Sequence, residues 1–326
     1  MTDRPASRIR RRSLLLGGGG AAAALALGGG LLWSPLAQAE SVSGGVFDLD
    51  AGSTKFLREK TLQHTTVLQS FAFDNTNKHL YVLQATGSEK AGNLVLTKLN
   101  QSGTKLGYMT LKGFGHGVAM GVELAGSTPW IWTETDANTD SGYGRAVTRF
   151  KFTNKQTLTY GVSSLTAYRA HSGSTSNTPS IDMLNGRIAI RYRTGSDMNY
   201  KVFKLADFKA KNYTPLHTFK QTGIGSSEVF QGWCLHGDYV YQLAGTCYTS
   251  ESGANPPSAH GNTYVSSIDI RTGKQHERKR TEAAYSLSYR EPEGLAVQTG
   301  SQNRLHMGFA SGASGARKCS LYYKAQ

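Results

Sequence analysis

Cysteine is scarce in this sequence: its 326 residues contain three, Cys234, Cys247 and Cys319. Three cysteines in one chain can form at most one disulfide bond, which excludes a small fold held together by several bridges. None of them has the C-x-x-C spacing of a zinc or redox site. We therefore expect these cysteines to serve in packing, and we expect no metal site built from them.

The short motifs of several large enzyme classes are also missing. The sequence has no P-loop, no dinucleotide-binding fingerprint, no H-E-x-x-H and no G-x-S-x-G. Its longest glycine run, residues 17–20, lies near the N-terminus. These absences exclude a cytoplasmic nucleotide enzyme, and we expect no organic cofactor.

The first 39 residues have the pattern of an export signal. Arg10-Arg11-Arg12 precede a stretch rich in Gly, Ala and Leu, and Ala37-Gln38-Ala39 provides the small residues that a signal peptidase accepts. A transmembrane anchor is the alternative, but the many Gly and Ala residues make the stretch only weakly apolar. We predict a twin-arginine-type signal peptide at residues 1–39 and a secreted or cell-wall-associated protein that does not stay inserted in the membrane.

Acidic residues are outnumbered by basic ones. The chain has 36 Lys and Arg against 22 Asp and Glu; residues 1–39 hold five of the arginines and one aspartate, which leaves 31 minus 21, or +10. No Lys/Arg block resembles a nucleic-acid-binding arm, so we expect no nucleic-acid partner. A basic exported domain favours anionic polymers, and a cationic surface that only maintains solubility is the alternative.

Helical periodicity is nearly absent from residues 40–326, where short β-rich runs alternate with Gly, Asn, Asp and Ser clusters. Five pairs of these runs predict five β-hairpins: 70–74 with 80–83, 118–122 with 130–133, 180–183 with 187–190, 231–234 with 239–242, and 294–297 with 305–308. Further strands follow most pairs, so the repeat is about four strands in roughly fifty residues, the period of propeller blades.

This repeat predicts that residues 40–326 form one all-β domain, a five-bladed β-propeller. The last repeat is short, and Val46-Phe47-Asp48-Leu49 stands alone before the first. We expect this N-terminal strand to complete the fifth blade, because a ring closed by pairing the chain ends leaves no exposed sheet edge. A β-sandwich or a β-helix is the alternative fold.

The inner strands of a propeller line its central channel, where crowding selects small residues such as Gly121, Gly232 and Gly294. Polar residues just ahead of these strands are then expected to meet at one mouth of the channel. They are His116, Ser180, Asp182, Gln231, Glu291 and Glu293.

The motif Glu291-Pro292-Glu293 is the most distinctive of these elements. Pro292 favours an extended backbone, which would point both carboxylates to the same side. Two such carboxylates can share a proton, bind a cation such as calcium, or accept hydrogen bonds from sugar hydroxyls. A purely structural role, accepting backbone N–H groups, is the alternative.

Several of these motifs resemble a known family. Gly115-His116-Gly117, Phe230-Gln231-Gly232 and above all Glu291-Pro292-Glu293-Gly294-Leu295 are similar to the propeller domain shared by teichoic acid biosynthesis protein C, some phage receptor-binding or baseplate propellers, and helveticin-type bacteriocins. The resemblance covers residues 45–325. It implies a five-bladed propeller associated with cell-wall glycopolymers, and it transfers no catalytic residue.

Two classes of function follow. The first is a secreted, monomeric module that binds an anionic, teichoic-acid-like glycopolymer at the channel mouth through His116, Arg191, Arg193, Gln231 and Glu291. Arg187, Arg191 and Arg193 alternate with apolar residues and should share one face of a strand. An ion-paired solvent face is the alternative for these arginines.

The second class is an enzyme that cleaves polysaccharides at the same mouth, with His116, Asp182, Glu291 and Glu293 as candidate catalytic residues. Hydrolysis needs two carboxylates on opposite sides of the scissile bond, and Asp182 could oppose one of the glutamates. Elimination from a uronic acid would instead need a base, such as His116 or a tyrosine, and a group to neutralise the carboxylate, for which Gln231, Arg191 or Arg193 could serve. The sequence leaves open whether the protein is an enzyme.

Overall fold

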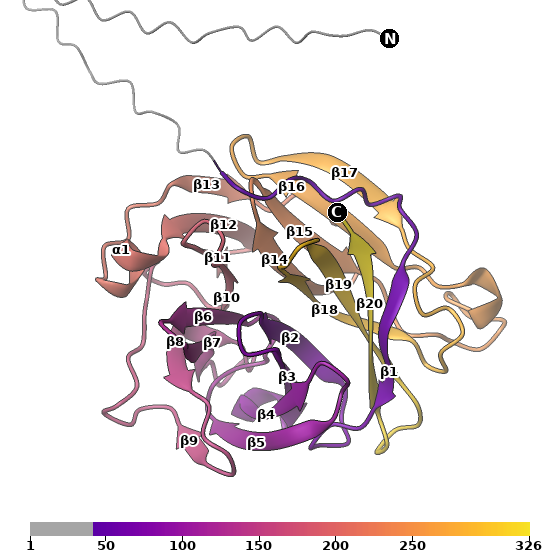
Figure 1. Ribbon diagram of the computed structural model, residues 1–326, viewed down its shortest axis with the longest axis horizontal. Coiled ribbons are helices and arrows are strands. Elements are labelled where there is room, and N and C mark those ends of the chain that lie inside the picture. The colour runs from indigo at the N-terminus through magenta and orange to yellow at the C-terminus, as the bar shows by residue number, and fades with distance from the viewer. Residues whose placement is uncertain (1–41) are drawn as a thin grey trace, which may run out of the picture. The chain divides into compact units, whose positions relative to one another are not determined.

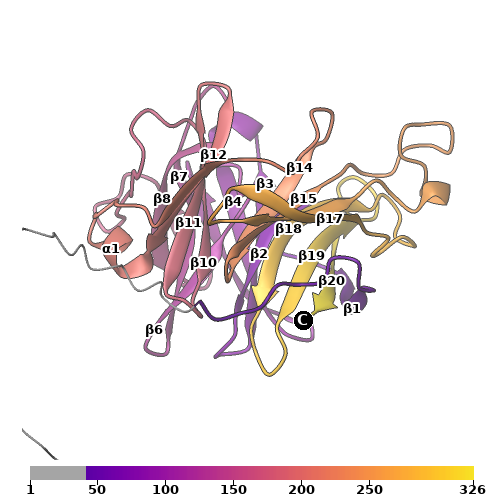
Figure 2. The ribbon, with the colours of Figure 1, turned by 90° about the horizontal axis from the view of Figure 1, so that it is seen from above.

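The structure is a computed structural model that describes residues 42–326, a range in which twenty β-strands are accompanied by three short helical segments. The strands form five separate sheets. Figure 1 shows these sheets arranged around a common axis, and Figure 2 shows the ring from the side. The predicted five-bladed β-propeller is therefore confirmed. The predicted signal peptide, residues 1–39, lies outside the described residues.

The blades follow one another along the chain. Blade 1 contains β2 (Leu68–Asp74), β3 (His79–Thr86), β4 (Asn93–Asn100) and β5 (Lys105–Lys112). Blade 2 contains β6 (Gly121–Ala125), β7 (Thr128–Ala137) and β8 (Gly144–Lys151). Blade 3 contains β10 (Asn177–Asp182), β11 (Arg187–Thr194), β12 (Asp197–Lys204) and β13 (His217–Lys220). Blade 4 contains β14 (Phe230–His236), β15 (Tyr239–Ala244), β16 (Tyr264–Asp269) and β17 (Lys274–Arg280). Blade 5 contains β18 (Glu291–Gln298), β19 (Arg304–Ser311), β20 (Lys318–Ala325) and β1 (Thr54–Lys60). The helical segments are η1 (Glu89–Ala91), α1 (Leu205–Lys209) and η2 (Pro257–Ala259).

Each predicted hairpin corresponds to the first two strands of one blade, as in β2–β3 and β14–β15. Alternating side chains of these strands are buried between neighbouring blades. Leu83 of blade 1 and Ile131 of blade 2, for example, belong to the same buried cluster. The core is thus a set of layers between blades, which explains why strands with apolar residues on both faces recur throughout the chain.

The ring is closed by an N-terminal strand, but not by the segment predicted from the sequence. The closing strand is β1, which pairs antiparallel with β20. The segment Val46–Leu49 forms no strand; Phe47 and Leu49 are completely buried instead, in a cluster of blade 4 and blade 5 side chains. Its backbone bonds to side chains rather than to a sheet: the Phe47 N–H donates to the Tyr241 hydroxyl. The alternation in this segment therefore marks burial without strand pairing.

Blade 2 has three strands where the repeat predicts four. The next strand, β9 (Thr157–Thr159), leaves blade 2 and pairs in parallel with β5 of blade 1. The outer edge of β8 is covered by a single bridge, in which Val147 and Tyr168 exchange two backbone hydrogen bonds. The chain after blade 2 therefore fastens blades 1 and 2 together.

The inner strands run in the same direction through the ring. Between β10 and β14 the Trp233 indole donates to Thr178 and the Leu235 N–H donates to Ser180, both over a separation of 55 residues. A constant separation means that the two strands lie in parallel register. We call the face where the inner strands begin the entry face and the face where they end the exit face. In residues 42–326, no helix is long and apolar enough to cross a membrane.

Candidate functional site

Glycines bring the inner strands into backbone contact near the entry face. A Cβ atom on Gly232 would lie 2.5 Å from the Gly294 Cα, and one on Gly294 would lie 2.9 Å from the Ser70 Cα. The Ser70 hydroxyl in turn donates to the Gly117 carbonyl at 2.6 Å. These contacts link blades 4, 5, 1 and 2, and only glycine permits such close approach. His116, Gln231 and Glu293, each one residue ahead of a linked glycine, therefore lie on the entry face.

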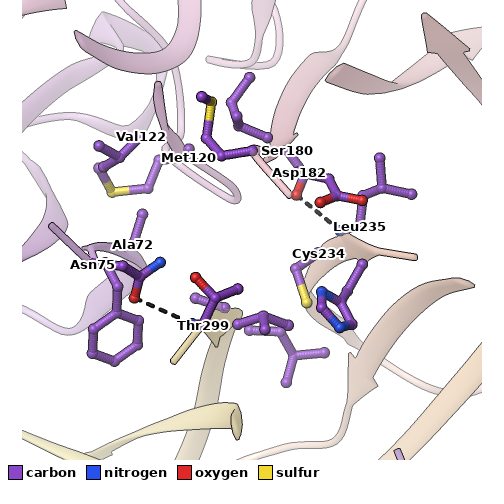
Figure 3. Close-up of a pocket in the computed structure, with 17 residues that line it drawn as sticks. Ala72, Asn75, Met120, Val122, Ser180, Asp182, Cys234, Leu235 and Thr299 are labelled. Atoms are coloured by element: carbon purple, nitrogen blue, oxygen red, sulfur yellow. Dashed lines mark hydrogen bonds between the residues drawn. The ribbon is translucent and has the colours of Figure 1, made fainter. Parts of the chain in front are cut away.

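The channel widens toward the exit face. A cavity of about 50 Å³ is lined by the second halves of β10, β14 and β18, with Ser180, Cys234 and Leu235 among its residues, and by Met120, which precedes β6 (Figure 3). This space can hold a few water molecules, since one needs about 10 to 15 Å³. It is too small for a sugar residue, so a polymer cannot thread the channel and any large ligand must lie across a face.

Asp182 lies at the exit face, not with the other predicted residues. It is the last residue of β10, and its carboxylate accepts hydrogen bonds from Asn185, Arg187 and the Gly237 N–H. Ser180 lies in the same half of the strand, where it lines the cavity (Figure 3). Asp182 therefore cannot oppose Glu291 or Glu293, which are in the first half of β18, across a glycosidic bond.

His116 belongs to a buried arrangement at the start of blade 2. Its ring stacks on Tyr143, with centroids 5.0 Å apart and planes at 24°. Burial lowers the pKa of His116, so the imidazole is neutral at pH 7. Beneath it the carboxyl of Glu134, wholly buried, accepts N–H bonds from Gly117 at 2.6 Å and Gly144 at 2.5 Å. Burial raises the pKa of Glu134 to about 7 even though these donors lower it.

The predicted arginines lie on the side of β11 that faces blade 4, but their environments differ. Arg187 is buried at the exit end, where it pairs with Asp182 at 3.1 Å. Arg191 is buried near the entry end, where it lies 3.7 Å from the Phe230 ring centroid and donates twice to Gln221. Arg193 is exposed.

Gln231 makes a hydrogen bond within the fold. Its side chain is buried, and its amide nitrogen donates to the Gly245 carbonyl at 2.9 Å. The neighbouring Phe230, half-buried, is the ring on which the Arg191 guanidinium stacks. The cationic side of the entry face therefore consists of Arg191 on Phe230 together with the exposed Arg193.

The two glutamates of the Glu-Pro-Glu motif have different roles. Glu291 is half-buried and accepts a hydrogen bond from the Tyr289 hydroxyl at 2.8 Å. Glu293 is buried. Burial, and secondly the charge of Glu291, raises the pKa of Glu293 well above its usual value. Burial therefore favours the neutral form of Glu293, whereas Glu291 acts as a hydrogen-bond acceptor.

Apart from Ser180 and Asp182, the predicted site residues thus lie on the entry face, but they belong to different blades. His116, Arg191 and Arg193 belong to blades 2 and 3, whereas Glu291 and Glu293 begin blade 5. Among residues 42–326, no group of three or more His, Cys, Asp or Glu side chains could hold a metal ion. The three cysteines are free, and two of them, Cys234 and Cys319, are buried.

Sequence reasoning missed Glu134, Tyr143, Tyr289 and Arg317. Arg317 lies over the Tyr289 ring, 3.2 Å from its centroid, beside the Glu-Pro-Glu motif. Tyr289 lies two residues before Glu291, the first residue of this motif. This closeness in sequence is the one signal that could have suggested Tyr289. Glu134 carried no signal, because its burial depends on contacts between segments that are distant in sequence.

Comparison with known proteins agrees with this architecture. A protein of Bacillus subtilis (strain 168) named "Putative major teichoic acid biosynthesis protein C" is 29% identical over 289 residues, which cover 85% of this chain and 63% of that protein. The tail fiber of Staphylococcus aureus phage P68 shares the fold, with a TM-score of 0.69 at 19% identity, over 83% of this chain and 52% of the fiber. The chain thus spans less than two thirds of either relative. Residues 67–323 match the family described as the phage 5-bladed beta propeller receptor binding platform domain, and the chain belongs to this family.

Proposed function

We propose that this protein binds an anionic glycopolymer of the cell wall, of the teichoic acid type, on the entry face of its propeller and outside the cytoplasmic membrane. Family membership supports a receptor-binding role, and the name of the Bacillus subtilis relative supports a teichoic acid. The basic excess of the chain, 36 Lys and Arg against 22 Asp and Glu, favours a polyanion over a neutral polymer.

The observation that carries the proposal is a set of two arginines stacked on aromatic rings at strand ends on the entry side, neither of which has a carboxylate partner among residues 42–326. Arg191 lies over Phe230 and Arg317 over Tyr289, with distances to the ring centroids of 3.7 and 3.2 Å. A third stacked arginine, Arg278 over Tyr264 at 3.9 Å, is already paired with Glu228. A guanidinium group held on an aromatic ring keeps hydrogen-bond donors for phosphate or carboxylate in a fixed plane. The aromatic rings provide apolar faces beside these donors.

The polymer lies across the entry face, because backbone contacts narrow the channel there and the cavity at the other end holds only about 50 Å³. This binding mode needs no catalytic group. Hydrolysis by Glu291 or Glu293 would need an opposing carboxylate, and Asp182 cannot provide it because it lies at the exit face.

The test is retention of the purified protein on teichoic, teichuronic and neutral glycans at increasing salt. We expect retention on the two anionic polymers that weakens steeply with salt, because screening shortens the reach of surface charge to about 8 Å at physiological ionic strength. Arg193→Gln should weaken retention, and Arg271→Gln, a matched change of an exposed arginine in the turn between β16 and β17, should not. Salt-insensitive retention on a neutral glycan would contradict the proposal, and new reducing or unsaturated ends would favour a polysaccharide-cleaving enzyme.

A further inference from the structure

A second cavity lies outside the central channel, between loops of blades 4 and 5. It has about 630 Å³ and is lined by Tyr248, Tyr285, Tyr289 and Arg317, with serines and a proline between them. We call it the tyrosine cleft. One wall is the loop between β15 and β16 with its turn η2, which projects from the ring (orange in Figure 1), another is the 281–290 connection, and the third is the loop between β19 and β20. The volume suits a ligand of one or two sugar units, within the range of small-molecule sites.

We propose that the tyrosine cleft binds one unit of an acidic saccharide, with the sugar ring stacked on Tyr285 and an oxyanion, phosphate or carboxylate, held by Arg317. The polymer class rests on the function proposed above. The cleft itself is argued from its own residues, which are distinct from those predicted at the channel mouth.

Tyr285 presents an open aromatic face. Its side chain is 54% exposed, unusual for a large aromatic residue in this fold, and its ring contacts His260 with centroids 4.7 Å apart. The backbone beneath it is fixed, because the Tyr248 hydroxyl donates to the Tyr285 carbonyl at 2.9 Å. An exposed ring on a fixed backbone can stack on a sugar without much loss of conformational entropy.

Arg317 supplies a positive charge without a carboxylate partner among the described residues. One of its terminal nitrogens donates to the Gly312 carbonyl, and the guanidinium lies over the Tyr289 ring. The nearby acid, Glu291, bonds to the Tyr289 hydroxyl rather than to Arg317. The planar guanidinium is thus held in place while several of its N–H groups are left for an oxyanion.

The wall of the cleft contains strained backbone. Tyr289 and Arg290 are consecutive residues with φ of 67° and 40°, and Ala284 has φ of 62°, all in the left-handed region that non-glycine residues avoid. Such conformations persist only where the surrounding structure fixes them, and they gather at ligand sites. Here the completely buried Arg290 does so, because its side chain donates to the carbonyls of Thr281 and Ala283.

The experiment measures binding of the full chain by titration calorimetry to four polymers. The polymers are poly(glycerol phosphate) with and without sugar side chains, polygalacturonate and dextran. We expect Tyr285→Ala to weaken binding to the sugar-bearing acidic polymers about tenfold and Tyr285→Phe to leave it within about twofold, because the ring remains. Arg317→Gln should cause a similar loss and reduce the dependence on salt.

Two variants serve as controls. Tyr160→Ala removes another partly exposed tyrosine, 37% exposed, and Arg271→Gln removes an exposed arginine, both away from the cleft. Each should bind like the parent, and all variants should keep the parent's melting temperature. The oxyanion is phosphate if Arg317→Gln weakens binding to poly(glycerol phosphate) more than to polygalacturonate, and carboxylate if the reverse holds.

The outcomes separate this proposal from the proposed function. If the parent binds and Tyr285→Ala or Arg317→Gln binds equally well, the cleft is not the site, and the proposed function stands with Arg191 and Arg193 as its cationic groups. The loss of binding with only one of these two variants also overturns the assignment, because the sugar and the oxyanion must be held together. If the parent binds none of the acidic polymers, the proposed function is wrong and the cleft assignment is wrong with it.

Discussion

Glu134 provides a quantitative test of how the entry face is built. Burial raises its pKa from 4.5 to about 7, a difference of about 2.5 units. Each unit corresponds to about 1.36 kcal/mol, so the free energy of unfolding should change by about 3 kcal/mol as this group titrates. Because the folded-state pKa lies above the unfolded one, the contribution is fully present below about pH 4.5 and is lost as the pH rises through about 7.

The perturbation is Glu134→Gln, followed by urea unfolding of parent and variant between pH 4.5 and 8.5. The raw pH profile is mixed, because burial lowers the pKa of His116, His236 and His306, and such histidines destabilise the fold as the pH falls through 6.5. The difference between the two proteins cancels these contributions. The variant should be less stable by about 1 to 3 kcal/mol at pH 5, because an amide cannot accept hydrogen bonds on both sides.

We expect that difference to shrink by about 3 kcal/mol between pH 5 and 8.5, so that the variant equals or exceeds the parent in alkaline solution. A gap between parent and Glu134→Gln that widens as the pH rises would refute the reasoning. It would mean that the N–H groups of Gly117 and Gly144 stabilise the charged form by more than burial destabilises it.

Three further variants test other parts of the fold. Phe47→Ala should lower the free energy of unfolding by about 3 to 5 kcal/mol in urea titrations, because the ring is completely buried, whereas Val46→Ala, at a residue that is 40% exposed, should have little effect; equal effects would contradict the role given to this segment. Glu293→Gln should change the free energy of unfolding by less than about 1 kcal/mol at pH 5. In alkaline solution the variant should be more stable than the parent, because the raised pKa of Glu293 means that its ionisation destabilises the folded parent. A loss of stability confined to alkaline pH would refute this. Arg290→Met should cost at least about 2 kcal/mol and increase hydrogen exchange in the 281–290 connection, because buried carbonyls lose their donor; unchanged exchange would show that the guanidinium does not hold the loop.

The blade architecture could be predicted because its signal is local and repeated. Each inner hairpin combines two apolar runs with a turn rich in Gly, Asn or Asp, and five such hairpins leave few alternatives. The closing strand had no such signal. It reads Thr-Lys-Phe-Leu-Arg-Glu-Lys, and as an outer strand it buries mainly Leu57. Val46–Leu49 looked more like a strand because it contains the apolar residues Phe47 and Leu49 at alternate positions. Those two side chains are buried by tertiary packing, without strand pairing.

The candidate site was harder to predict than the fold. An error of a few residues in the boundary of an inner strand moves a side chain from the entry face of the propeller to the exit face. The third inner strand begins at Asn177 and contains Pro179, whereas the sequence suggested that it begins at Ser180. Asp182 was therefore expected at the start of the strand and lies at its end. His116, Gln231 and Glu293 escaped this error because each of them directly precedes a glycine at a backbone contact.

The Glu-Pro-Glu motif can now be interpreted from its surroundings. Its Gly294 contacts both Gly232 and Ser70, so the motif lies where blades 4, 5 and 1 meet and needs an extended approach to the strand. Burial raises the pKa of Glu293 there, while Glu291 accepts a hydrogen bond from the Tyr289 hydroxyl and so orients the ring on which Arg317 lies. Glu291 therefore supports a ring that lines the tyrosine cleft. The Glu-Pro-Glu motif, expected to bind ligand at the channel mouth, is thus better interpreted as a structural element that orients residues of the neighbouring tyrosine cleft.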